Sequence, residues 1–121
     1  MQFARETIDV NYKIQSYAPG LVRVADKDYH DSILVAEHAL RSWDVTNLAN
    51  MQQNNLRSII DLDPKIVIFG SGAKLVFPPD ILLCELQQQG IGFEVMLTDA
   101  ACRTYAILSA DQRKAVAALI I

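Results

Sequence analysis

Polar and reactive side chains gather where a strand-like run of the chain ends. Residues 91–97 read as a strand, and four such side chains follow within six positions: Thr98, Asp99, Cys102 and Arg103. The first turn of a helix exposes unpaired N–H groups and the positive end of the helix dipole. A helix that begins here could therefore hold an anion or lower the pKa of a thiol.

Cys102 is the one plausible nucleophile of this segment. A helix start and the neighbouring Arg103 would both lower the pKa of its thiol and raise the thiolate fraction. No histidine lies nearby in the sequence to act as a base. Because free cysteines are among the most commonly buried residues, a structural role in the core is the favoured interpretation. We assign no catalytic residue, and we expect that the protein is not an enzyme.

The other three side chains also have a functional and a structural interpretation. Arg103 could bind an anionic ligand through its planar guanidinium, or it could pair with Asp99 or Glu94. An exposed ion pair of this kind contributes about 0.3–0.5 kcal/mol. Thr98 is most simply the N-cap of the helix, and Asp99 complements the helix dipole in the first turn.

A second candidate is the loop Gly70-Ser71-Gly72, which follows the apolar run 65–69. A dinucleotide fingerprint would need a third glycine where Leu75 stands, and no Gly-Lys-Ser/Thr follows for a phosphate loop. We favour a tight turn that needs a positive φ angle. The alternative is a backbone nest for a carboxylate or a phosphate.

The two candidate segments are expected to meet. Strand–helix–strand over residues 65–97 is a parallel crossover unit, expected to be right-handed, and ligands bind beyond the carboxyl ends of such strands. Both segments lie at those ends and should share one rim of the sheet. The combined candidate ligand-binding set contains Ser71, Gly72, Thr98, Asp99, Cys102 and Arg103.

Length, charge and cysteine content limit the class of protein. The 121 residues fit a single domain over 1–121, and the net charge of −3 without a basic stripe argues against nucleic-acid binding. Cys84 and Cys102 show no C-x-x-C spacing, which fits free thiols in a reducing compartment.

His30 and His38 lack further ligands around them, so we expect no metal and no cofactor. Residues 1–7 are too polar for a signal peptide and no run is long enough to span a membrane, so a cytoplasmic protein is expected.

Apolar spacing predicts the following elements. Residues 8–37 are expected to form an antiparallel meander, and helices and strands alternate after it. The expected strands are 12–17, 21–24, 32–36, 65–69, 74–77 and 91–97, with a polar turn at 26–28. The expected helices are 48–60, 81–89 ending at Gly90, a short one from Thr98, and a last one that runs from the capping-box pattern Ser109-x-x-Gln112 through Leu119.

Four segments together resemble a known family: residues 66–72, 77–79, 90–96 and 100–105. This family contains the mitochondrial complex I assembly factor three and the adipogenesis-associated Mth-domain protein, with bacterial relatives of unknown function. The resemblance implies a three-layer α/β fold around a mixed central sheet, with an additional N-terminal β layer. It implies no reaction, since the mitochondrial member acts through protein contacts. The family more often has Gly-Thr-Gly in the loop and asparagine after the tyrosine, where this chain has Ser71 and Ala106.

Two functions follow as hypotheses. The preferred one is a non-enzymatic protein-binding or assembly-factor-like module, with an unidentified protein partner and with homo-oligomers left open. The alternative is a small-anion or nucleotide-binding protein, including a thiol-dependent enzyme, with its site in the two loops. Trp43 is expected as a buried anchor, although an exposed tryptophan beside Arg41 would suit a binding hot spot.

Overall fold

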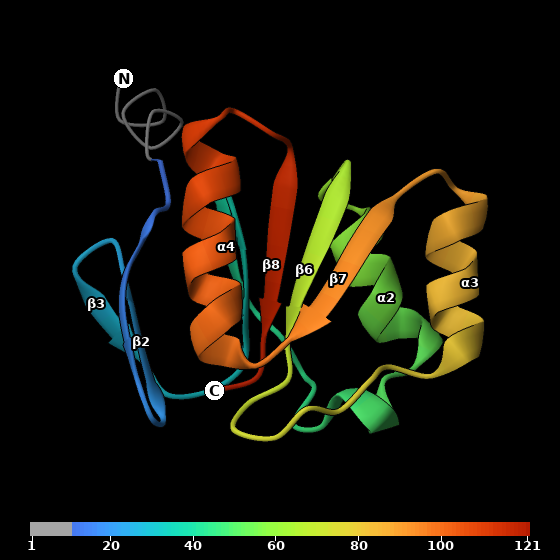
Figure 1. The fold of residues 1–121 in the computed structure, drawn as a ribbon, viewed down its shortest axis with the longest axis horizontal. Coiled ribbons are helices and arrows are strands. Elements are labelled where there is room, and N and C mark those ends of the chain that lie inside the picture. Colours follow the sequence, from blue (N-terminus) through green and yellow to red (C-terminus); the bar gives the residue numbers. More distant parts are fainter. Residues whose placement is uncertain (1–10) are drawn as a thin grey trace, which may run out of the picture.

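The computed structural model describes residues 11–121, which form two β-sheets and the helices that pack on them (Figure 1). The expectations for the polar start at residues 1–7, and for the meander from Ile8 to residue 10, lie outside the described residues. The elements follow in the order β1 (Ile14–Ala18), β2 (Leu21–Val24), β3 (Lys27–Tyr29), β4 (Ile33–Ala36), β5 (Ala39–Ser42), the 3-10 helix η1 (Leu48–Asn50), α2 (Gln53–Ile60), β6 (Ile66–Gly70), α3 (Asp80–Gln88), β7 (Gly92–Met96), α4 (Thr98–Ala110) and β8 (Ala115–Leu119).

The five-stranded sheet has the order β5-β4-β8-β6-β7 and forms the middle layer. β8 lies at its centre, antiparallel to β4 and parallel to β6. β6 and β7 are parallel, which confirms the strand–helix–strand unit expected over residues 65–97. α2 and α3 cover one face of the sheet, while α4 and the sheet β1-β2-β3 cover the other (Figure 1). The expected three-layer α/β fold with an N-terminal β layer is confirmed.

Side chains of the central strand alternate between two apolar cores. In β8, Val116 and Ala118 join the core beneath α2 and α3, whereas Ala117 and Leu119 join the core beneath α4. A strand that is buried on both faces requires this pattern, because successive side chains point to opposite faces of the sheet. Tyr105 on α4 belongs to the same core as Ala117 and Leu119.

The expectation of a last helix through Leu119 is wrong. α4 runs on to Ala110, the chain turns at Gln112 with φ +59°, and the next residues form β8. The alanine-rich sequence of β8 has a high helix propensity, but backbone pairing with strands on both sides outweighs this local preference.

The expected N-terminal meander is correct in type but wrong in its third strand. The positive φ angles of Ala25 and Asp26 place the turn early, so that Lys27 and Asp28, expected in the polar turn with Asp26, belong to β3 instead. The strand over 32–36 exists as β4, but it belongs to the five-stranded sheet.

Three further expectations are corrected around the core. The helix expected over 48–60 is divided at Met51 into η1 and α2, and α2 has its own capping box between Gln52 and Asn55. Residues 74–77 form no strand. β7 is an edge strand and only half-buried, whereas a buried strand was expected. Trp43 is buried as expected, and its Nε1 donates a hydrogen bond to the Asn55 carbonyl at 3.2 Å.

Candidate functional site

The two candidate loops meet at the carboxyl ends of β6 and β7, as expected. The Thr98 hydroxyl accepts a hydrogen bond from the Gly72 N–H at 2.7 Å and donates one to the Ile120 carbonyl at 2.6 Å. The Thr98 N–H donates to the Gly72 carbonyl at 3.1 Å. Thr98 is fully buried, and Leu97 occupies the cap position of α4 instead, so the N-cap interpretation of Thr98 is wrong. Its side chain joins three segments of the backbone.

The loop over residues 70–72 is a hydrogen-bonded turn. Gly72 has φ +95°, which confirms that the turn needs a glycine. The Ser71 N–H donates to the Met96 carbonyl at 2.9 Å, and the Ser71 hydroxyl donates to the Lys74 carbonyl at 2.6 Å. At Gly70, a Cβ atom would lie 2.9 Å from the Thr98 hydroxyl oxygen, so the close approach of α4 also requires a glycine there. The N–H groups that a nest would offer to an anion are already used.

The first turn of α4 is likewise occupied by its own chain. The Ala100 N–H donates to the Asp99 carboxylate at 2.8 Å, and the Ala101 N–H donates to the Leu97 carbonyl at 2.9 Å. Asp99 therefore complements the helix dipole as expected, and its negative charge stands where an anionic ligand would have to bind.

Asp99, Cys102 and Arg103 lie away from that junction, along a pocket of about 260 Å³ between β1 and α4. Arg103 pairs with Asp99 at 3.9 Å, and its side chain is 70% exposed, so the ion-pair interpretation is the one the geometry supports. Ala106 lies in the wall of the same pocket, where a polar residue would have offered a hydrogen bond. The candidate set therefore divides into a buried junction and a separate surface pocket.

Cys102 is buried, with 5% of its surface exposed. Burial, and to a lesser extent the Asp99 carboxylate, raise the pKa of its thiol to about 11, while Arg103 opposes both effects. An activated thiol would need a lowered pKa, so the structural interpretation of Cys102 holds. Both cysteines are free thiols, as expected, and Cys84 is exposed.

We predict that a thiol reagent separates the two cysteines. Iodoacetamide at neutral pH should label Cys84 in the folded protein, while Cys102 should react only when the protein unfolds, because its thiol is both buried and protonated. Mass spectrometry of the labelled peptides, with and without denaturant, measures this difference. Equal labelling of the two thiols in the folded protein would contradict the assignment of Cys102 to the core.

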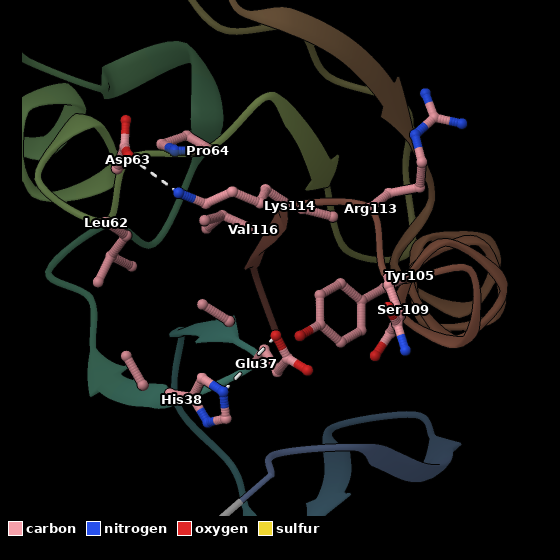
Figure 2. Close-up of a pocket in the computed structure, with 14 residues that line it drawn as sticks. Glu37, His38, Leu62, Asp63, Pro64, Tyr105, Ser109, Arg113, Lys114 and Val116 are labelled. Carbon is pink, nitrogen blue, oxygen red and sulfur yellow. Dashed lines mark hydrogen bonds and ion pairs between the residues drawn. The ribbon is translucent and has the colours of Figure 1, made fainter. Parts of the chain in front are cut away.

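A second pocket lies at the opposite end of the sheet and was missed by sequence reasoning (Figure 2). Its volume is about 200 Å³, and it lies between the β4–β5 turn, the α2–β6 loop and the α4–β8 turn. Figure 2 shows the Tyr105 hydroxyl directed toward the Glu37 carboxylate, which pairs with His38 at 3.6 Å. The Lys114 ammonium pairs with Asp63 at 2.9 Å across another wall, and this lowers the pKa of Asp63.

Tyr105 is the buried titratable residue of this pocket. Burial, and to a lesser extent the Glu37 charge, raise the pKa of its phenol to about 12, while a hydrogen bond with Ser109 opposes both effects. The signal that could have found this residue is its place in residues 100–105, one of the four segments that carry the family resemblance. The pocket itself depends on the turn between α4 and β8, where the sequence predicted a helix.

The side chains and helices of residues 11–121 also bear on metals and membranes. Within this part of the chain, no group of three or more His, Cys, Asp or Glu side chains could hold a metal ion. None of the helices described combines the length and the apolar character that crossing a membrane requires.

Comparison with known proteins gives a family and two kinds of relative. A family model described as a protein of unknown function (DUF498/DUF598) matches residues 14–120. The "13 kDa major membrane protein" of Francisella tularensis subsp. holarctica is 27% identical over all of this chain and 99% of its own length. The NADH dehydrogenase (ubiquinone) 1 alpha subcomplex assembly factor 3 of Danio rerio is 31% identical over 88% of this chain, and the match spans 63% of that protein.

Solved structures share the fold. The NMR structure of the Xanthomonas campestris protein XCC1710 has a TM-score of 0.86 and 26% identity, and the match covers 100% of this chain and 92% of that one. A Bordetella pertussis protein described as an Mth938-like domain, also solved by NMR, has a TM-score of 0.78 and 24% identity over 91% of this chain and 85% of that one. At 24% identity, the similarity to the Bordetella pertussis protein is evidence for a shared fold only.

Proposed function

Because the chain belongs to the DUF498/DUF598 family of unknown function, a distant member of which is a complex I assembly factor, we propose that it is a non-enzymatic protein-binding module. The family membership agrees with the resemblance seen in the sequence. The Danio rerio relative supports a role in assembly by its name, and the match spans 63% of that protein. Its partners are therefore not transferred to this chain.

The observation that carries the proposal is an exposed apolar segment before and at the start of α3. Leu75, Phe77 and Ile81 have 58%, 54% and 77% of their surfaces exposed, and they lie within seven residues of one another. These residues lie in the loop that leads from β6 to α3 and in the first turn of α3 (Figure 1). Single exposed apolar residues are common, but several large ones in one segment are typical of a surface that a partner covers. We call Leu75, Phe77 and Ile81 the apolar segment.

The small-anion alternative draws less support. The N–H groups of Ser71 and Gly72 donate to Met96 and Thr98, and the Asp99 carboxylate occupies the start of α4. A thiol-dependent reaction would also need a thiolate at Cys102, whose pKa is raised instead.

A cytoplasmic location remains part of the proposal. A cytoplasm offers the reducing conditions in which Cys84 and Cys102 stay free thiols. The name of the Francisella tularensis relative points instead to a membrane, so cell fractionation of the tagged chain should accompany the binding experiment.

We predict that the partner is lost when the apolar segment becomes polar. The double variant Phe77→Ser and Ile81→Ser should recover at least about tenfold less partner than wild type, since burying one such side chain contributes about 1.5–3 kcal/mol. Tagged chain would be cross-linked in the cells that make it, and the captured proteins quantified by mass spectrometry. Folding should be unaffected because both side chains are more than half exposed.

The matched control is Ile107→Ser, which removes an equally large side chain that is 65% exposed on α4. This control variant should recover as much partner as wild type. The proposal fails if no protein is enriched specifically, or if the double variant recovers the same protein in the same amount.

A further inference from the structure

The outer edge of β7 carries backbone groups that no strand pairs with. β7 lies at the end of the five-stranded sheet, and β6 is its single strand neighbour among residues 11–121. The Gly92 N–H donates to the Lys65 carbonyl, and the Met96 carbonyl accepts from the Ser71 N–H, so both residues bond toward β6. In a parallel ladder, alternate residues bond to the same neighbour. The N–H and C=O groups of Phe93 and Val95 therefore point away from the sheet.

This edge lacks lysine, proline and bulges, three of the devices that usually protect a sheet from pairing with another chain, and its one charged side chain is Glu94. Exposed edges are protected by lysine, proline, bulges or a covering segment. The sequence of β7, Gly-Phe-Glu-Val-Met, contains neither basic residue nor proline, and its register with β6 is continuous over all five residues. The opposite edge strand, β5, is shorter and carries the exposed Arg41. An additional strand should therefore pair more easily with β7 than with β5.

We propose that an extended segment of a partner protein adds to β7 as a further strand, and that this segment has a basic residue between two apolar ones. The inference rests on the proposed protein-binding function and names where and how the partner binds. Strand addition of this kind draws affinity from main-chain hydrogen bonds and specificity from alternate side chains.

The side chains of β7 determine the chemistry of the added strand. Phe93 and Val95 are half-buried and pack against the core beneath α2 and α3, so the residues beside them should be apolar. α3, which packs against β7, lies on that same side. Glu94 points to the other face and is exposed, and a directly opposite lysine or arginine forms a favourable cross-strand pair. The apolar segment leads into α3, so one partner could cover both surfaces.

A second copy of this chain does not fit the same edge. Antiparallel pairing of two β7 strands makes the most hydrogen bonds when Phe93 of each copy opposes Val95 of the other. That register places Glu94 directly opposite Glu94, and like charges in this position are destabilising. The occupant is therefore a different protein with a basic residue at this point.

The test is selection of phage-displayed short random peptides on the full-length chain. Wild type should enrich peptides with a lysine or arginine between apolar residues. Glu94→Lys should reverse the central preference to acidic residues, by about tenfold or more in relative enrichment, because the cross-strand charge is reversed. Val95→Pro should abolish enrichment, since it removes an outward N–H that no strand of the protein uses.

The matched control is Arg41→Glu, a charge reversal on the opposite edge strand, which should leave the selected peptides unchanged. A domain that binds peptides by strand addition, selected in parallel, shows that the library can report such binding. The inference is overturned if no peptide is enriched on wild type while that domain succeeds, or if the enriched peptides keep their basic residue on Glu94→Lys. If the peptide test fails in this way while cross-linking still captures a partner through the apolar segment, only the inference about β7 fails and the proposed function stands. If cross-linking captures no specific partner either, the proposed function fails as well.

Discussion

Replacing Thr98 with valine is expected to lower the free energy of unfolding by about 2–4 kcal/mol. The change keeps the shape of the side chain but removes a hydroxyl that is fully buried. The Gly72 N–H then loses its acceptor and the Ile120 carbonyl loses a donor. A buried polar group without a partner costs about 1–3 kcal/mol, and Thr98 and Ile120 are both buried at this junction. Urea denaturation with linear extrapolation measures the difference.

Two further variants make this measurement specific. Thr98→Ser retains the hydroxyl and should recover most of the lost stability. Thr104→Val removes the hydroxyl of another threonine in α4, which donates to the weak sulfur acceptor of Met96, and it should cost less than about 1 kcal/mol. A loss in Thr98→Val no greater than in Thr104→Val would mean that the junction does not depend on this side chain.

The second large effect is expected at alkaline pH. The pKa of Cys102 is raised from 9.0 to about 11 and that of Tyr105 from 10.0 to about 12, in both cases mainly by burial. Both groups are neutral when protonated, so the folded state holds their protons more tightly than the unfolded state does. Their contribution to stability is complete below the unfolded pKa and is lost as the pH rises through the folded pKa. Stability should fall by about 2–3 kcal/mol for each group between pH 9 and 12.

Single variants separate the contributions of Cys102 and Tyr105 to this loss of stability at alkaline pH. Tyr105→Phe should remove the part between pH 10 and 12, and Cys102→Ala should remove the part between pH 9 and 11, whatever each variant does to stability at pH 7. Urea titrations at a series of pH values give the slope directly. A Tyr105→Phe variant with the same slope as wild type above pH 10 would show that this phenol does not titrate with unfolding.

The meeting of Gly72 and Thr98 could be predicted from the sequence because it depends on a general rule. Two consecutive parallel strands with a helix between them bring their carboxyl ends to the same rim, whatever their side chains are. Which groups occupy that rim could not be predicted in the same way. Only the positions of Ile120 and Met96 reveal that the polar groups there bind one another.

Local sequence patterns could not predict that β8 is a strand at the centre of the sheet. Ala-Val-Ala-Ala-Leu after a capping-box pattern is typical of a helix, and its strand form is stabilised by β4 and β6, which are distant in the sequence. The same error hid the pocket around Tyr105, because its wall includes the turn before β8. β7 was expected as buried for a related reason, since an apolar run does not reveal whether a strand has one neighbour or two.

The central place of β8 also governs how the chain can fold. The β4–β5 hairpin and the β6–α3–β7 unit are each local, but they share no strand pairing until β8 enters between them. Ile33 then pairs with Leu119, across most of the described chain. Loop closure over such a separation costs entropy before any contact compensates for it, so assembly of the sheet is a late and slow step. Until that step, the apolar faces of both local units remain open to other chains, and exposed apolar surface of this kind makes a folding intermediate prone to aggregate.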